Sequence, residues 1–219
     1  VSRAEAAKMI FSIRNNGSIN ADSFKTAPTT FTDISGHWAE GYIKYCQTMG
    51  IISGKSATIF DPNGTVKGTE LAKMMLVTLG YDAQKAGIYG ATWATTTLAL
   101  ASENGLLDGV DSDLTAGLPR QYTAQMMYNA IQAPTVRWST DGNAYTDMGT
   151  NNMPNETVGS KYMNLTIYEG TLEGSGDFNA GNDKVKIEVE KIDGVEVAKE
   201  NKGDKTFTFA TDLTGMYGQ

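Results

Sequence analysis

The chain contains an internal repeat, which limits its possible folds more than its composition does. Three segments align without gaps: VSRAEAAKMI from Val1, VKGTELAKMM from Val66 and LPRQYTAQMM from Leu118. Ahead of the last two, WAEGYIKYCQTMGIISG from Trp38 aligns with WATTTLALASENGLLDG from Trp93. Because one repeat unit usually cannot bury its apolar face alone, the copies are expected to pack together. The chain is therefore predicted to hold the end of one repeat and two further repeats.

The central copy, residues 31–75, is predicted to form a helix, a turn-rich ribbon and a second helix. The apolar residues of the first helix recur at helical spacing and are expected to be buried: Trp38, Tyr42, Ile43, Cys46 and Met49. Asp33 or Ser35 could cap this helix, and Gly50 stands where a left-handed residue commonly ends one. The second helix is predicted over residues 70–79.

The first turns of the repeated helices differ from one another. Ser2 and Glu5 form a capping box, in which each side chain accepts a hydrogen bond from the backbone N–H of the other residue. In the central copy Lys67 and Gly68 stand where the first copy has Ser2 and Arg3, so this box is predicted to be broken. The copies are therefore expected to share a backbone but not a set of polar side chains.

The last part of the chain has the pattern of strands. Residues 133–159 are rich in polar residues, Gly and Pro, and are predicted to be a linker that partly packs on the repeats. Further on, apolar residues alternate with charged residues or threonines, as in half-buried strands: Val185, Ile187, Val189, Phe207 and Phe209. Asp193 and Gly194 predict a hairpin turn. Residues 160–219 are predicted to be a small β-domain, which could be cut before it closes.

Composition narrows the class of protein. The chain has 219 residues, 40% of them apolar, which is enough for a folded core. A net charge of −7 without a long basic run argues against nucleic acid as a partner. No apolar run approaches the roughly 18 residues of a membrane span. Since the chain opens inside a repeat, an N-terminal portion is expected to be missing, and the lack of a signal peptide says little about the compartment.

Several spaced motifs together resemble a known family. F-x-D-I-x-x-H-W-A begins at Phe31, G-I-I-x-G at Gly50 and F-x-P-x-G-x-V at Phe60, and an R-A-E helix starts at Arg3. In this order they resemble the S-layer homology (SLH) module, over about residues 1–132.

The resemblance implies a fold and a division of the chain. Residues 1–30 would be the end of repeat 1, residues 31–85 repeat 2 and residues 86–132 repeat 3. In that family three repeats close into a pseudo-threefold spindle with grooves between them. The implied class is α+β: a mostly helical SLH repeat bundle with an incomplete first repeat, followed by the small β-rich module.

The resemblance also implies a function. Such modules hold surface proteins of Gram-positive-type bacteria to the cell wall by binding a secondary wall polysaccharide, often a pyruvylated one. Non-covalent anchoring at an extracellular location is therefore expected, without a cofactor, a membrane span or catalysis. The expected partners are this polysaccharide or peptidoglycan, and a second partner class is self-association in a surface layer. Two alternatives stay open: a self-assembly segment that has lost sugar binding, and the anchor region of a larger secreted wall enzyme.

An anionic sugar needs a cation, and arginine at the start of a helix adds a bidentate fork to the helix dipole. The family pattern is matched in full by Arg3 and Glu5, and in part by Arg120 and by Glu70. Arg3 could instead be a solvent-exposed first-turn residue, and Glu5 could act only as a helix cap. Because Gly68 replaces the arginine of the central copy, its groove is predicted to bind weakly or not at all, while the Arg3 and Arg120 grooves carry the affinity.

The rest of the expected site is apolar surface and backbone. Trp38 and Trp93 are more simply explained as core anchors than as platforms for a sugar, since one helix face can hide them. Gly54 and Gly109 lie in tight turns that could let a ligand approach backbone N–H groups.

Catalysis and metal binding have little support in the sequence. His37 is the only histidine and is expected to be a helix-start residue beside a tryptophan, while the acidic residues are scattered over loops. Asp108, Asp111 and Asp113 offer oxygen ligands for calcium, but this stretch lacks the Gly and the terminal Glu of an EF-hand loop. A solvated acidic turn is the favoured interpretation.

Overall fold

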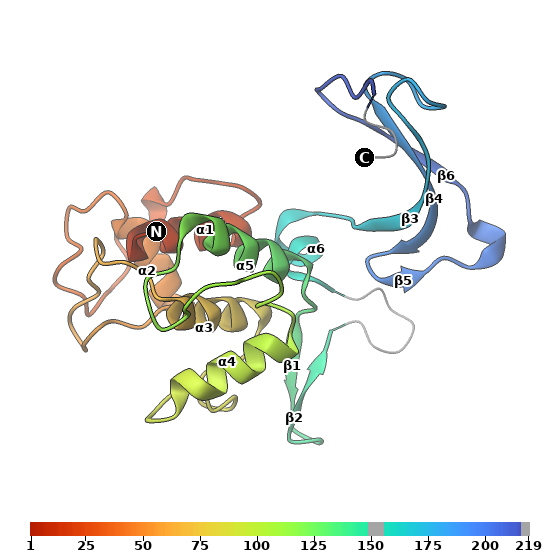
Figure 1. Ribbon diagram of the computed structural model, residues 1–219. Coiled ribbons are helices and arrows are strands. Elements are labelled where there is room, and N and C mark those ends of the chain that lie inside the picture. Colours follow the sequence, from red (N-terminus) through yellow and green to blue (C-terminus); the bar gives the residue numbers. More distant parts are fainter. Residues whose placement is uncertain (149–155, 216–219) are drawn as a thin grey trace. The chain divides into compact units, whose positions relative to one another are not determined.

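The computed structural model describes residues 1–148 and 156–215 and divides the chain into two compact units (Figure 1). Unit 1 contains residues 1–148 and 156–165 and is mostly helical. Unit 2 contains, among the described residues, 166–215 and is built on a β-sheet. The expected α+β class is confirmed. No helix in the described ranges is long and apolar enough to cross a membrane.

The elements of unit 1 follow the repeat pattern. In chain order they are α1 (Arg3–Arg14), the 3₁₀ turn η1 (Asp22–Phe24), α2 (Glu40–Thr48), α3 (Gly68–Leu79), α4 (Trp93–Glu103), α5 (Arg120–Gln132), β1 (Val136–Ser139), β2 (Ala144–Asp147) and α6 (Val158–Met163). The helix predicted over residues 70–79 corresponds to α3. The capping box at the start of α1 is present, with Ser2 N–H donating to Glu5 at 2.7 Å and Glu5 N–H donating to the Ser2 hydroxyl at 3.1 Å.

The core of unit 1 lies between α1, α2 and α3. Side chains of all three helices are almost fully buried there: Ile10, Phe11, Ile43, Cys46, Leu71 and Met75. Phe11 meets the rings of Phe24, Tyr42 and Tyr45 edge to face, at centroid distances of 4.9–5.9 Å. Burying each large apolar side chain contributes about 1.5–3 kcal/mol. The predicted core position of Cys46 is confirmed, and burial raises the pKa of its thiol to about 12.

Two predictions for the first helix of the central copy were wrong. Trp38 is 53% exposed and Met49 is also exposed, because α2 spans only Glu40–Thr48 and both residues lie outside its buried face. Ser35 does not cap this helix, whose N-cap residue is Ala39 without a side-chain hydrogen bond, and neither does Asp33. Its carboxylate instead accepts from the backbone N–H groups of Phe60 and Asp61, at 2.9 and 2.7 Å, and so ties the ribbon to the start of the repeat.

The start of α1 is bonded to the ribbon of the following repeat. Arg3 N–H donates to the Gly64 carbonyl at 2.8 Å, and Ala4 N–H donates to the Pro62 carbonyl at 2.9 Å. These are two of the N–H groups that the first turn of a helix leaves without an intrahelical partner. The ribbon therefore supplies the acceptors that α1 needs at this end.

The start of α3 repeats this arrangement one copy further along the chain. Gly68 N–H donates to the Ala116 carbonyl at 3.2 Å, and Thr69 N–H donates to the Leu114 carbonyl at 2.8 Å. A Cβ on Gly68 would lie 2.7 Å from the Leu114 Cδ2 and 2.8 Å from its Cα. A side chain at position 68 would thus displace the backbone of the next ribbon.

Within residues 133–159, the described part contains a hairpin and the start of α6. β1 and β2 pair antiparallel, with Trp138 opposite Tyr145. The Tyr145 ring lies 4.5 Å from the ring of Tyr81, and its hydroxyl accepts from the Asp82 N–H at 2.8 Å. These contacts hold the hairpin against the loop that follows α3.

Unit 2 is an antiparallel sheet centred on one strand (Figure 1). Its elements are β3 (Tyr168–Ser175), β4 (Lys184–Ile192), β5 (Val195–Glu196), the 3₁₀ turn η2 (Lys199–Asn201) and β6 (Asp204–Thr208). β4 pairs with the other three strands. The hairpin predicted at Asp193 and Gly194 is confirmed, and both residues have the positive φ, 49° and 76°, that a two-residue turn of this kind needs. Phe207 lies in β6 as predicted, whereas Phe209 follows the strand and is exposed.

Candidate functional site

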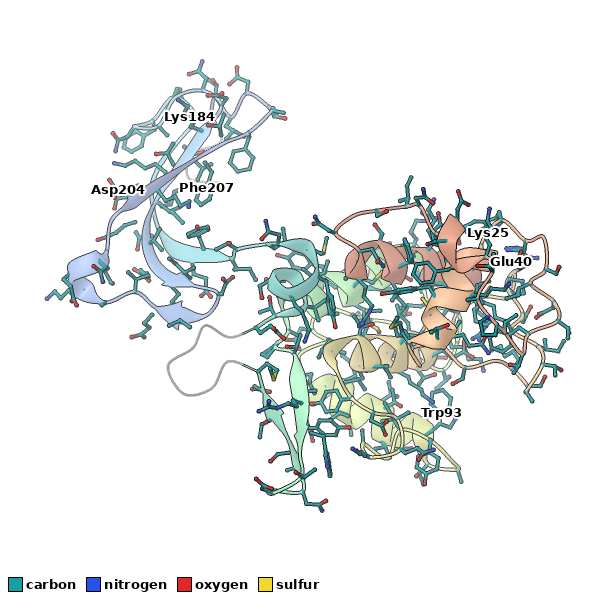
Figure 2. All side chains as sticks on the ribbon, turned by 180° about the vertical axis from the view of Figure 1, so that it is seen from behind. Lys25, Glu40, Trp93, Lys184, Asp204 and Phe207 are labelled. Atoms are coloured by element: carbon teal, nitrogen blue, oxygen red, sulfur yellow. The ribbon has the colours of Figure 1, made fainter. Side chains whose placement is uncertain are left out.

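A pocket of about 340 Å³ in unit 1 brings together four of the eight predicted binding residues. Arg3 comes from α1, Gly54 from the ribbon, Glu70 from α3, and Trp93, which is labelled in Figure 2, from the start of α4. Arg3 and Trp93 are 90 positions apart in the sequence. The four residues meet only because the successive repeat segments pack against one another. The pocket also contains polar and aromatic residues that the sequence analysis did not single out.

Arg3 forms the floor of this pocket and is 2% exposed. Its Nε donates to the Phe60 carbonyl at 2.8 Å and its Nη2 to the Ser53 carbonyl at 2.7 Å. Its Nη1 donates to the Glu70 carboxylate at 2.9 Å, and its guanidinium carbon lies 4.6 Å above the Phe60 ring. The interpretation of Arg3 as a solvent-exposed first-turn residue is therefore wrong. Its charge is buried and paired, as a buried ion must be if it is not to destabilise the fold.

Glu70 balances two cations at the edge of the pocket. Besides Arg3, it accepts from the Lys55 ammonium at 2.5 Å and from the Lys67 backbone N–H at 3.2 Å. Half of the capping box of α3 is thus kept, although Lys67 offers no side-chain acceptor in return. Burial alone would raise the pKa of Glu70, but the hydrogen bonds from Lys55 and the Lys67 N–H, with the Arg3 charge, hold it below its ordinary value of 4.5. Glu70 is therefore ionised at neutral pH.

Gly54 keeps the ribbon wall of the pocket free of a side chain. A Cβ at this position would lie 2.3 Å from the Ser56 carbonyl oxygen, 2.5 Å from that of Ile59 and 2.6 Å from the Phe31 ring. No other residue fits without moving the backbone. The pocket wall beside Ser53 is consequently main chain.

Trp93, Tyr89 and Lys73 also line the pocket. Trp93 is half-buried and Tyr89 exposed, and the Lys73 ammonium lies 5.6 Å from the centroid of the Trp93 ring. The interpretation of Trp93 as a core anchor is wrong, because its ring faces this hollow. Lys73 was missed by the sequence analysis, yet a signal existed: the aligned first copy has Lys8 at the same position.

The remaining predicted residues lie outside this pocket. The Arg120 side chain is 79% exposed and donates to Glu5 at 3.2 Å. The Ser2 backbone N–H lowers the pKa of Glu5. Trp38 lines a smaller hollow of about 180 Å³ beside Tyr42 and the loop before η1. Gly109 stands at a positive φ beside the Gln125 side chain.

The structure does not gather the acidic candidates for calcium. In the described ranges, no three histidine, cysteine, aspartate or glutamate side chains come together as a metal site, so Asp108, Asp111 and Asp113 do not form one. Asp113 accepts from the Thr115 N–H at 2.9 Å and from its hydroxyl at 2.7 Å, and these bonds lower the pKa of Asp113. His37 accepts from the Ala39 N–H at 3.1 Å, in agreement with its predicted place at the helix start.

Comparison with known families identifies the module that contains the ribbon. Residues 30–72 match the model of the S-layer homology domain. The chain carries an S-layer homology domain. The matched stretch supplies Ser53, Gly54, Lys55 and Glu70 to the pocket, while Arg3, Lys73 and Trp93 lie on either side of it.

The relatives of this chain include surface proteins and an amylopullulanase. A surface layer protein of Brevibacillus choshinensis is 25% identical over 171 residues, which are 76% of this chain and 14% of that protein. A cell surface protein of Thermoanaerobacter kivui is 25% identical over 119 residues, 54% of this chain and 15% of that protein. An amylopullulanase of Thermoanaerobacterium thermosulfurigenes is 27% identical over 85 residues, 36% of this chain and 5% of that protein. The chain thus spans at most 15% of the length of each of these relatives.

The domain and the surface-layer relatives place the chain at the cell surface, in the cell wall or surface layer. They support a role in anchoring surface proteins to the wall.

Proposed function

We propose that this SLH-domain chain anchors a surface protein by binding an acidic polysaccharide of the cell wall, and that the pocket at Arg3, Glu70 and Trp93 holds one of its sugar units. The observation that carries the proposal is the composition of the pocket. It combines an aromatic wall, a main-chain wall and cationic side chains around a hollow of about 340 Å³.

The two walls of the pocket suit the two surfaces of a sugar. Trp93 and Tyr89 offer flat apolar rings for the C–H face of a pyranose, while the ribbon at Ser53 and Gly54 offers polar main chain for hydroxyl groups. Binding rather than hydrolysis follows from the acidic groups. Glycoside hydrolysis uses two carboxyl groups facing one bond, whereas Glu70 is the single carboxylate among the residues that line the pocket.

The arrangement of the repeats supports a pseudo-threefold bundle as part of this proposal. The starts of α1 and α3 make the same two backbone bonds to the next ribbon, so the two interfaces are built alike. Leu114 fills the space at Gly68, which supports the prediction that this groove binds weakly or not at all. Arg120 occupies the third equivalent position with an exposed guanidinium, so any contribution from it would come from the surface.

Two relatives suggest two different kinds of protein to which the anchoring region could belong. The surface layer protein suggests that the anchored part self-associates into a layer, and the amylopullulanase suggests a larger secreted wall enzyme. The anchoring role of the pocket is the same in both. A second function, self-assembly without sugar binding, is the alternative that the following experiment addresses.

Co-sedimentation with isolated cell walls tests the proposal. The purified chain is mixed with native walls and with walls from which acid has removed the secondary polysaccharide. We expect the chain to pellet with native walls and to stay in solution with extracted ones. Equal pelleting with both would identify peptidoglycan as the partner, and absence of pelleting together with concentration-dependent oligomers would favour the self-assembly function.

A further inference from the structure

We propose that Lys73, on α3, is the residue that receives the acid group of the ligand in this pocket, and that Arg3 is a structural residue below it. This inference rests on the proposed function and specifies its chemistry. It also departs from the sequence-based expectation that arginine clamps the sugar.

The guanidinium of Arg3 makes its hydrogen bonds within the protein. Each of its three guanidinium nitrogens donates a hydrogen bond within the protein, at 2.7–2.9 Å, and the side chain is 2% exposed. Its partners come from the ribbon and from α3. A ligand that drew the guanidinium away would break the contacts that join three segments. Two of the five guanidinium N–H groups make no bond in the described part of the chain, but they are buried with the rest of the side chain.

One of the cationic side chains that line the pocket has no carboxylate partner among the lining residues. Its lining residues include three cations, Arg3, Lys55 and Lys73, and a single carboxylate. Glu70 bridges Arg3 and Lys55, at 2.9 and 2.5 Å. Across residues 1–148 and 156–215, no ion pair involves Lys73. Lys73 is thus the pocket cation whose charge remains available to a ligand.

The position of Lys73 favours an anion there. Its ammonium lies 5.6 Å from the Trp93 ring centroid, and its side chain is half-buried. Burial lowers the pKa of Lys73, and no neighbouring carboxylate counteracts this. A partly desolvated cation without a counter-ion is unfavourable, and an incoming anion restores the missing pairing. The pocket therefore gains more from an acidic ligand than from a neutral one.

The ligand chemistry follows from the neighbours of Lys73. The Lys73 ammonium lies over the Trp93 ring in a cation–π contact, so a sugar that contacts this ring would hold an acidic substituent close to Lys73. The acid group can be a carboxylate or a phosphate, since both pair with an ammonium. We infer a sugar with one acidic substituent and one apolar face.

The repeats supply a natural comparison for this residue. Lys8 stands at the equivalent position of α1 and does not line the pocket. In α5 the equivalent residue is Gln125, whose side chain donates to Asn129 at 2.9 Å. Of the three equivalent positions, only the one on α3 places a cation in this pocket.

Matched variants of the full chain test the inference. Lys73→Gln and Lys8→Gln remove the same charge from equivalent positions, so net charge and salt effects are identical. We expect Lys73→Gln to weaken binding to acid-released wall polysaccharide at least tenfold in titration calorimetry, and Lys8→Gln to change it less than about twofold. Lys73→Arg should retain most of the binding. Thermal unfolding of Lys73→Gln should match that of the unchanged chain, which separates a lost contact from a damaged fold.

Two further arms define the ligand and the failure modes. Glucuronic acid, glucose 6-phosphate and glucose are added as competitors, and one of the two acidic sugars should displace the polysaccharide better than glucose, which tells a carboxylate from a phosphate. Because burial lowers the pKa of Lys73, binding should decline on the alkaline side at a lower pH than in Lys73→Arg. If the unchanged chain binds the polysaccharide and Lys73→Gln binds it equally well, the inference is overturned while the proposed function stands. If the unchanged chain does not bind at all, both fall.

Discussion

The interface at Arg3 and the interface at Gly68 have the same backbone geometry and opposite contents. In both, two N–H groups at a helix start donate to carbonyls of the following ribbon. At the first interface an arginine runs beneath the ribbon and borders a pocket, whereas at the second Leu114 fills the corresponding space. The repeats thus keep one backbone joint, while the first interface borders the pocket proposed to bind a sugar and the second is filled by a side chain. At the aligned positions 3 and 68, the first interface has an arginine side chain and the second has none.

The largest expected effect comes from removing the arginine that joins the segments. Arg3→Ala leaves Glu70 with one cation fewer and two buried carbonyls without their donors, and we expect a loss of about 3 kcal/mol in the free energy of unfolding. The three tryptophans all lie in unit 1, so urea unfolding followed by their fluorescence measures it.

Arg120→Ala is the matched control, since Arg120 holds the equivalent position in α5. Its side chain is 79% exposed, and removal of a surface ion pair should cost less than about 1 kcal/mol. Equal losses for the two variants would mean that the bonds of Arg3 do not stabilise the interface.

The next effect addresses the closed interface. Gly68→Ala places a Cβ within 2.8 Å of the Leu114 Cα, and overpacking of this kind costs about 1–3 kcal/mol. Gly142→Ala serves as the control, because its Cβ would meet its nearest atom at an ordinary 3.6 Å. If both variants unfold at the same urea concentration, Leu114 is free to move and the interface is not closed by packing.

The two tryptophans at equivalent positions separate a pocket residue from a surface residue. Trp93→Ala removes the aromatic wall, and we expect binding to native walls to fall about tenfold, which is close to the 1–3 kcal/mol found for stacking contacts on an aromatic platform. Trp38→Ala should leave wall binding within about twofold, because Trp38 lines a different hollow. A greater loss for Trp38→Ala would move the binding site to that hollow.

The smallest expected effect is on the pH dependence of stability. The pKa of Glu70 is lower in the folded chain than its ordinary value of 4.5. Its contribution to stability is therefore complete above pH 4.5 and is lost as the pH falls through the folded pKa. Glu70→Gln should flatten the stability curve on the acid side more than Glu5→Gln, since Glu5 is more exposed and pairs with a surface arginine. An unchanged curve in Glu70→Gln would contradict this.

The sequence predicted the parts of the molecule that depend on local pattern. The repeat alignment located α1, α3, α4 and α5, and the capping box at Ser2 and the turn at Asp193 were correct because neighbouring residues alone determine them. The burial of Arg3 could not be predicted in this way. Its partners lie 50, 57 and 67 residues further along the chain, and no local pattern records such a meeting.

The errors at Trp38 and Trp93 have a common cause. Periodicity assigns a residue to a helix face only if the residue lies well within the helix, and both tryptophans stand at or before a helix start. Four of the eight candidate site residues were nevertheless brought into one pocket. The alignment shows the charge that Lys73 shares with Lys8, but only the fold determines which of the two lines the pocket.

The bonds between each helix start and the ribbon after it also determine the order in which the chain can assemble. The N–H groups at the start of α1 donate to the carbonyls of Pro62 and Gly64, and those at the start of α3 donate to the carbonyls of Leu114 and Ala116. The acceptors lie 58 and 61 residues downstream at the first joint and 45 and 48 residues downstream at the second, so each joint can form only after that length of chain has been synthesised. The start of α1 is thus completed by the second repeat, and the start of α3 by the third repeat. A chain that ended after one repeat would leave the N–H groups at its last helix start without acceptors. That helix start is therefore complete only when the following repeat is present.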